Sequence, residues 1–273
     1  VLVRGDADLV SMARPMLADS QFMQKAAEGR PEAINTCIAC NQACLDHTFN
    51  MKVTSCLVNP RACHETLLNY VATEGPKKIA VVGAGPAGLA YATVAAERGH
   101  QVTLFDEAKE IGGQFNLAKR VPGKEEFYET LRYFDHQLNE MGVEVILGQR
   151  ADVQTIKDGG FDHTVVATGI TPRQPDIPGI DHPMVMGYID AITGKREVGK
   201  KVAVIGAGGI GFDVTDLITH AGPSAAMDIS VCAKEWGIDF EQHPRGGVTG
   251  IEPEVARADR EVWLMQRKET PVG

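Results

Sequence analysis

Short, continuous apolar runs alternate along this chain with stretches whose apolar residues recur at helical spacing. A continuous apolar run is typical of a strand buried on both faces of a parallel sheet. Such a run occupies 78–82, and mainly apolar stretches interpreted as further strands occupy 101–105, 163–167, 202–205 and 261–265. Helices are predicted between them, at 86–97, 125–141 and 210–220. The alternation of strands with helices predicts an α/β protein built on parallel sheets.

The N-terminal region shows a weaker pattern of the same kind. Leu9 to Met12 is a short apolar run, and a turn and a helix starting near 18–20 are expected after it. Ala13 and Arg14 then lie at the carboxyl end of the strand. In a parallel barrel this end binds phosphate through backbone N–H groups and one cation. Arg14 is therefore a candidate phosphate ligand, and the alternative is a surface cation after an ordinary strand.

A glycine-rich turn, GAGPAG, follows the first strong strand. Its order of strand, turn and helix is the dinucleotide-binding fingerprint, with a tight turn, a close approach to pyrophosphate and helix-on-strand packing. The next strand ends in two acids, and an acid there accepts hydrogen bonds from ribose hydroxyls. The candidate residues are Gly83, Gly85, Pro86, Ala87, Gly88, Asp106 and Glu107.

Two further motifs favour FAD over NAD in this first unit. Gly113 and Gln114 belong to IGGQFN, whose paired glycines let the backbone approach an extended dinucleotide. Ala167, Thr168 and Gly169 end the run FDHTVVATG, which resembles the strand-end turn of flavoprotein reductases that bind two dinucleotides.

A second fingerprint begins at 202, with the candidate residues Gly206, Gly208, Gly209, Ile210 and Gly211. The strand that completes it is delayed by a polar insertion at 222–260. Arg267 and Lys268 stand at the end of that strand, where the first unit has an acid. Cations at this position would bind a 2′-phosphate, which predicts NADPH. The alternative is a solvated pair at a strand end.

Four of the six cysteines lie within twenty residues, at Cys37, Cys40, Cys44 and Cys56. Three close cysteines with a distant fourth suit a [4Fe–4S] cluster, whereas zinc would be expected to use two separated pairs. A disulfide is a third interpretation. Cys63 and Cys232 lie outside this spacing and are interpreted as small apolar residues.

Composition and charge narrow the function further. The formal net charge of −9 and the 6% aromatic content argue against a nucleic-acid partner. No apolar run approaches the ~20 residues of a membrane span, so no membrane association and a cytoplasmic location are expected. The chain begins at Val1, inside an apparent strand–helix unit, and ends at Gly273, just after another expected strand, so we expect a fragment of a longer protein.

Several stretches together carry a family resemblance, namely SMARPMLAD, CIACNQACLD, GGQFNLAK, GKEEFYETLRY, IGAGGIGFDVT, CAKEWGID and LMQRK. They resemble the C-terminal portion of bacterial-type NADPH-dependent 2,4-dienoyl-CoA reductases, in the flavoprotein group of Old Yellow Enzyme and trimethylamine dehydrogenase. The resemblance implies an FMN-bearing (β/α)₈ barrel, a [4Fe–4S] cluster on the four cysteines, and Rossmann-like FAD and NADPH domains in tandem. It also implies electron flow from NADPH through FAD, cluster and FMN to a dienoyl-CoA thioester in β-oxidation of unsaturated fatty acids.

The resemblance divides the chain into the barrel end at 1–30, the cluster segment at 31–74, part of the FAD domain at 75–198 and a truncated NADPH domain at 199–273. Most of the barrel is absent, so no catalytic acid can be assigned, and the oligomeric state stays unknown. Two alternatives remain open. One is an ene-reductase or amine dehydrogenase of the same architecture, and the other is a stand-alone NADPH-dependent electron-transfer module.

Overall fold

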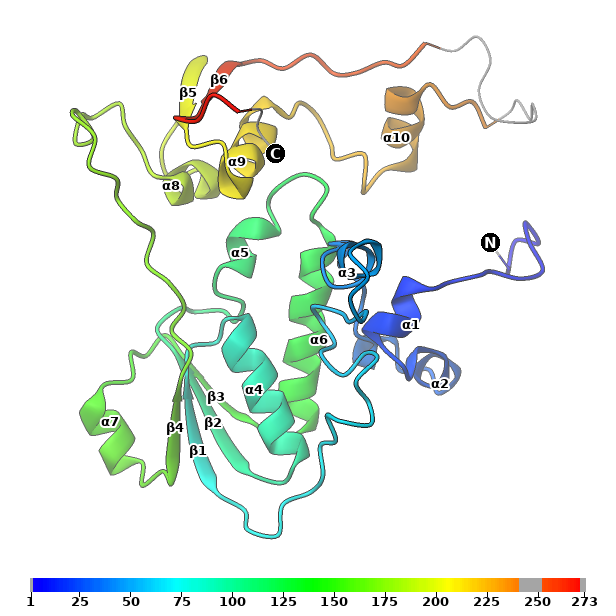
Figure 1. The fold of residues 1–273 in the computed structure, drawn as a ribbon, viewed down its shortest axis with the longest axis vertical. Helices are drawn as coiled ribbons and strands as arrows, with labels where there is room; N and C mark the ends of the chain where they lie inside the picture. Colours follow the sequence, from blue (N-terminus) through cyan, green and yellow to red (C-terminus); the bar gives the residue numbers. More distant parts are fainter. Residues whose placement is uncertain (1, 241–251, 271–273) are drawn as a thin grey trace. The chain divides into compact units, whose positions relative to one another are not determined.

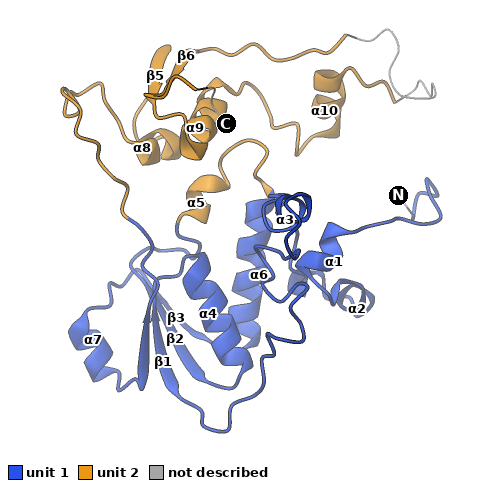
Figure 2. Cartoon of the chain, in the orientation of Figure 1, with its two compact units in different colours: residues 1–113, 126–170 blue, residues 114–125, 171–273 orange. Residues whose placement is uncertain are grey.

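The computed structural model describes residues 2–240 and 252–270. The chain divides into two compact units (Figure 2). Unit 1 comprises Val1–Gly113 and Glu126–Ile170, and unit 2 comprises Gln114–Glu125 and Thr171–Gly273. The chain thus passes from unit 1 to unit 2 and back before it enters unit 2 for the second time.

Unit 1 is built on a four-stranded parallel sheet in the order β3-β2-β1-β4. The strands are β1 (Lys78–Val82), β2 (Gln101–Asp106), β3 (Glu144–Leu147) and β4 (His163–Val166). Val82 at the end of β1 pairs in register with Phe105 on one side and Val166 on the other. The carboxyl ends of three strands therefore meet at one edge, which is where parallel α/β sheets bind ligands.

Helix α4 (Pro86–Glu97) packs on β1 and β2, and α6 (Glu126–Glu140) packs on α4 (Figure 1). The helix α7 (Val153–Asp158) precedes β4 and is capped by the Asp152 side chain, which accepts from Thr155 N. The core is apolar and closely packed, with Val81, Leu89 and Leu104 fully buried. The predicted strands and helices of this region are confirmed, whereas β3 and α7 had no prediction.

The N-terminal and cysteine-bearing part of unit 1 has little regular structure. It contains α1 (Arg14–Ala18), α2 (Phe22–Ala27), the 3₁₀ turn η1 (Pro31–Ala33) and α3 (Leu45–Phe49). The expected strand at 9–12 is not formed, and Leu9 is 89% exposed. A strand needs a neighbour for its backbone groups, and no described strand pairs with this segment.

Unit 2 holds a two-stranded parallel sheet of β5 (Lys201–Ile205) and β6 (Glu261–Met265). Its core consists of Ile192, Val214 and Ile218, from α8 (Tyr188–Thr193) and α9 (Gly209–Thr219). The short helix α5 (Phe115–Ala118) packs against α8. The predicted strands and helix of the second fingerprint are confirmed.

The insertion at 222–260 contains a helix that the sequence analysis did not predict, α10 (Ile229–Trp236). Asp228 caps it by accepting from Ser230 N and Val231 N, and Gly237 ends it in the left-handed region. Part of the insertion, 241–251, lies outside the described residues. The described helices include none with the length and apolar character needed to cross a membrane.

The two compact units and the predicted cofactor domains divide the chain at different residues. The predicted boundary at 198/199 falls inside unit 2, and Gln114–Glu125 also belongs to unit 2. The mixed α/β, Rossmann-like parallel sheet is confirmed. The assignment of each range to a barrel, cluster, FAD or NADPH domain stays a prediction.

Candidate functional site

The glycine turn of unit 1 leaves β1 at Gly83 and enters α4 at Pro86. Gly83 has a φ of +110°, which favours glycine, and Gly85 is the N-cap of α4. A Cβ on Gly83 would collide with the Ala167 carbonyl, and one on Gly88 would collide with the Gly83 carbonyl. Among the described residues, no atom outside the chain neighbours of Gly85 lies within 4 Å of a Cβ placed on it. The turn therefore packs tightly against the protein at Gly83 and Gly88, and it leaves free space next to Gly85, at the N-terminus of the 12-residue helix α4.

Two predicted segments far away in sequence meet this turn. Gly112 donates from its N–H to the Ala84 carbonyl (2.7 Å), and a Cβ on Gly113 would lie 3.0 Å from Gly85 Cα. At the end of β4, Ala167 N donates to Val82 O (2.8 Å). The paired glycines and the β4 end therefore line the same edge as the turn, with backbone N–H groups and a helix N-terminus that suit a pyrophosphate. Gln114 belongs instead to unit 2, where its side-chain oxygen accepts from the Tyr188 hydroxyl (3.3 Å).

The acids that end β2 have partners of their own. Asp106 accepts from Ala84 N (2.6 Å) and from Ala108 N (2.8 Å), so its carboxylate ties the end of β2 to the glycine turn. A carboxylate has about four acceptor sites, which leaves capacity for ribose hydroxyls. Glu107 is exposed and pairs with Arg150 (3.0 Å).

The glycine turn of unit 2 repeats this backbone geometry. Gly206 has a φ of +118°, and Gly208 is the N-cap of α9, whose first residues are Gly209 and Ile210. A Cβ on Gly211 would collide with the Gly206 carbonyl and lie 3.4 Å from a Leu264 methyl group. The equivalent Cβ on Gly88 would collide with Gly83 and lie 3.4 Å from a Val81 methyl group. Both turns therefore require glycine for the same reason, close approach of helix to turn.

The strand register refines the position of the predicted cations. Val82 pairs with Phe105 and Ile205 pairs with Met265, so Gln266, not Arg267, is equivalent to Asp106. Arg267 and Lys268 follow directly and are exposed. Gln266 was missed because strand register cannot be read from one sequence. Its side-chain amide donates to Thr270 O (2.5 Å).

The matched glycines allow a selective test. We expect Gly88→Ala to lower flavin retention about tenfold and spare pyridine-nucleotide binding, and Gly211→Ala to do the reverse, because overpacking costs about 1–3 kcal/mol. Equilibrium dialysis of both cofactors would measure this. Gly75→Ala and Gly199→Ala are the controls, since a Cβ at either position meets no atom within 4 Å in the described part of the chain. Equal loss of both cofactors in each variant would contradict two separate nucleotide sites.

All four predicted cysteines line one pocket in unit 1, together with Arg14 and Asn41. The loop that carries Cys37 and Cys40 is sharply turned, because Ala39 (φ +53°) and Asn41 (φ +59°) both lie in the left-handed region. Within this turn Ala39 N donates to Cys37 Sγ (3.4 Å). A hydrogen bond to sulfur is one way in which proteins tune a bound iron–sulfur cluster.

Backbone and side-chain contacts bring the distant Cys56 back to this pocket. Ser55 N donates to Ala43 O (2.8 Å), and the hydroxyls of Thr48 and Thr54 lie 2.7 Å apart. Burial raises the pKa of the Cys56 thiol, and charge on Cys37 and Cys40 acts in the same direction, while backbone N–H groups of Val58 and Asn59 oppose both. A bound metal would offset this penalty, because thiolates are the ligand form.

Although the four cysteines line one pocket, their thiols do not converge on a single point as the ligands of one metal ion would. Within 2–240 and 252–270, no three His, Cys, Asp or Glu side chains converge closely enough for that. Cys63, which is exposed, and Cys232 lie outside the pocket, as expected from their spacing. Arg14 was predicted at a strand end but lies at the first position of α1, where it donates to the Asn41 amide oxygen (2.5 Å).

Comparison with known proteins places this arrangement among oxidoreductases. Residues 77–231 match the family described as pyridine nucleotide-disulphide oxidoreductase. A metal reductase from Desulforamulus reducens is 39% identical over 226 residues, which cover 81% of this chain and 34% of the relative. An NADH oxidase from Thermoanaerobacter brockii is 35% identical over 248 residues, covering 88% of this chain and 38% of the relative.

A solved structure extends the similarity to nearly the whole chain. A 2-naphthoyl-CoA reductase in complex with 2-naphthoyl-CoA superposes with a TM-score of 0.77 at 30% identity. The match covers 96% of this chain and 44% of that structure. The chain spans about a third of the length of the curated relatives that it matches.

Proposed function

The chain belongs to the pyridine nucleotide-disulphide oxidoreductase family, and from this premise we propose that it is the electron-delivering portion of an NADPH-dependent 2,4-dienoyl-CoA reductase. The observation that carries the proposal is the presence of two matched glycine turns and a four-cysteine pocket in one chain. Similarity to a CoA-thioester reductase supports an acyl-CoA substrate. Because the chain spans only part of its relatives, this activity belongs to the whole protein.

The residues of unit 1 fit an FAD molecule. The open side of Gly85 and the N-terminus of α4 would receive the pyrophosphate, and Asp106 would accept from the adenosine ribose. Gly112 and Gly113 leave no side chain between the backbone and this edge. A flavin held there would supply two-electron chemistry with a nicotinamide and one-electron chemistry with further centres. In unit 2, the open Gly208 turn and Arg267 with Lys268 would receive NADPH.

The cysteine pocket fits a [4Fe–4S] cluster. Four thiols lie around one pocket, and the spacing of three close cysteines and a fourth at a distance is that expected for a cluster with one cysteine on each iron. Cys37, Cys40, Cys44 and Cys56 would hold it. A cluster supplies single-electron transfer, which suits a chain that connects a two-electron donor to a second flavin.

The proposal also assigns FMN phosphate to Arg14, in a barrel whose last part is 1–30. Arg14→Ala should lower FMN affinity by about one to two decades, since a charge-assisted contact is worth about 1.5–3 kcal/mol. FAD should be retained. Flavin analysis after dilution of the intact protein would measure both. Equal retention of the two flavins would contradict a contact between Arg14 and the FMN phosphate, and the role of Arg14 would be its hydrogen bond to Asn41.

A second candidate is electron transfer to an acceptor other than a thioester. The relatives named metal reductase and NADH oxidase favour it. An ene-reductase or amine dehydrogenase of the same architecture is the third candidate.

Steady-state assays of the intact protein with NADPH distinguish these candidates. A 2,4-dienoyl-CoA should be reduced far faster than the free dienoic acid, and an amine should not be oxidised. Ferric citrate and dioxygen should accept electrons slowly. Rapid reduction of ferric citrate with no turnover of the thioester would replace the proposal with the second candidate.

A further inference from the structure

Arg132, on the middle of α6, makes four polar contacts with its guanidinium group. Two of these are to carbonyl groups of the segment ahead of the cysteines, those of Glu32 and Ile34 (2.9 Å to Ile34). A third is to the Thr36 hydroxyl (3.4 Å), and the fourth is to Glu129 on its own helix (2.6 Å). The side chain is 32% exposed. An arginine fork can serve several acceptors in one plane, which a lysine ammonium cannot do.

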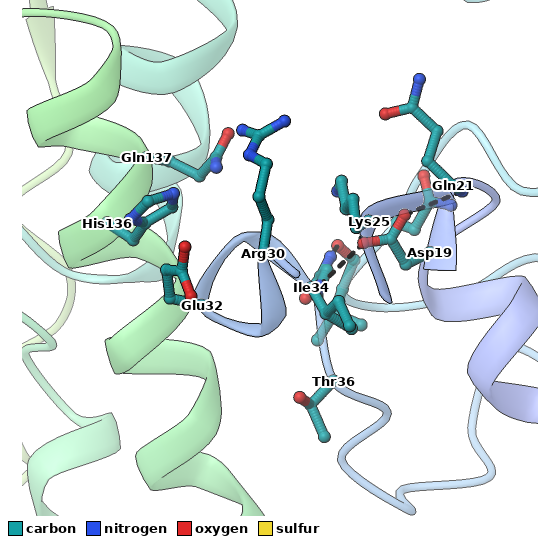
Figure 3. Close-up of polar contacts among 12 residues, drawn as sticks. Asp19, Gln21, Lys25, Arg30, Glu32, Ile34, Thr36, His136 and Gln137 are labelled. Carbon is teal, nitrogen blue, oxygen red and sulfur yellow. Dashed lines mark hydrogen bonds and ion pairs between the residues drawn. The ribbon is translucent and has the colours of Figure 1, made fainter. Parts of the chain in front are cut away.

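The segment that Arg132 holds leads directly into the cysteine loop. Asn35 lies two residues before Cys37, is buried, and donates from its side chain to Val58 O (2.7 Å), two residues after Cys56. Its backbone N–H donates to the buried Asp19 carboxylate (2.9 Å), which also accepts from Gln21 N and Lys25 Nζ (Figure 3). The two ends of the cysteine loop are thereby joined to one another at Asn35.

The same helix makes a second contact with this segment. Arg30, before η1, pairs with Glu140 at the end of α6. Arg132 and Glu140 lie about two turns apart on α6, so the turn η1 is held at both ends. Ala33, the last residue of η1, is fully buried. Helix α6 packs on α4, and the N-terminus of α4 follows the glycine turn at 83–85. Helix α6 therefore connects the cysteine loop at 37–56 to the sheet edge that carries this turn.

We propose that Arg132 is a positioning residue that fixes the cysteine loop relative to the nucleotide-binding sheet of unit 1. Its consequence for electron transfer rests on the proposed function. Electron transfer between two centres falls steeply with their separation, so a loop that moves on α6 would slow transfer without losing either cofactor.

Hydrogen exchange of the intact protein tests the contact itself. In Arg132→Gln, exchange at the amides of 32–36 should be about ten- to a hundredfold faster. The reason is that the free energy of local opening falls by the contribution of the lost charge-assisted hydrogen bonds. Arg132→Lys should restore this protection in part, since it keeps the charge but not the fork. Arg98→Gln is the matched control, because Arg98 donates to the Val71 carbonyl (3.1 Å) elsewhere in unit 1.

Stopped-flow reduction by NADPH tests the consequence. Arg132→Gln should keep wild-type iron and flavin contents and the wild-type rate of flavin reduction, but pass electrons to the iron–sulfur centre more slowly. Unchanged exchange at 32–36, or an unchanged rate of electron transfer, would each overturn the proposal. A wild-type protein without iron would overturn the proposed function instead, and the exchange measurement would still decide whether Arg132 holds this segment.

Discussion

Replacing Cys40 with alanine in the intact protein is expected to remove the iron–sulfur centre and abolish turnover of a dienoyl-CoA. Cys40 lines the pocket with Cys37, Cys44 and Cys56, and its replacement removes one of the four thiolates that hold a [4Fe–4S] cluster. Iron should fall from about four per chain to below about one. The NADPH-to-FAD step should persist, because the two glycine turns involve no cysteine.

Cys63→Ala is the matched control for this prediction. Cys63 is an exposed cysteine outside the pocket, so its replacement should change neither iron content nor turnover. Elemental analysis and visible absorbance provide the measurement. Stoichiometric zinc in the wild type, or full iron content in Cys40→Ala, would refute the cluster.

Coenzyme preference should depend on the two cations after β6. The double variant Arg267→Ala, Lys268→Ala should raise the KM for NADPH and leave that for NADH nearly unchanged, because only NADPH has a 2′-phosphate. Each charge-assisted contact is worth about 1.5–3 kcal/mol, so the preference for NADPH should shrink by about two decades or more.

Lys200→Ala is the control for coenzyme choice. Lys200 is an exposed cation at the amino end of β5, the end opposite the Gly206 turn. Steady-state kinetics with both coenzymes would give the ratio. An unchanged preference in the double variant would mean that neither cation binds the 2′-phosphate. Gln266, which the strand register makes equivalent to Asp106, would then be the next residue to replace.

Local signals in the sequence were sufficient for the elements that carry the glycine turns. Apolar stretches predicted β1, β2, β4, β5 and β6. Burial on both faces explains this for β1 and β2, which are almost entirely buried, whereas β5 and β6 alternate between exposed and half-buried residues. The glycines were predictable because each turn needs a positive φ or a close helix contact. The strand expected at 9–12 failed, since apolar residues alone do not supply the neighbouring strand that a strand requires.

Contacts between distant segments could not be predicted from one sequence. Arg132 sits in a helix with clear amphipathic spacing, and nothing local marks its contacts with Glu32 and Ile34, about a hundred residues earlier. The contact between Arg14 and Asn41 is of the same kind. The helix α10 was not predicted because it lies in a polar insertion, although Asp228 and Gly237 are ordinary signals for its start and end.

Anaerobic reductive titration of the intact protein with NADPH, followed by addition of a 2,4-dienoyl-CoA, tests the central claim most directly. The proposed set of centres should take up about five electron equivalents per chain, two for each flavin and one for the cluster. An excess of the thioester should then withdraw electrons two at a time and reoxidise both flavins. Uptake of only about two equivalents, or reduced centres that the thioester leaves unchanged, would contradict the account.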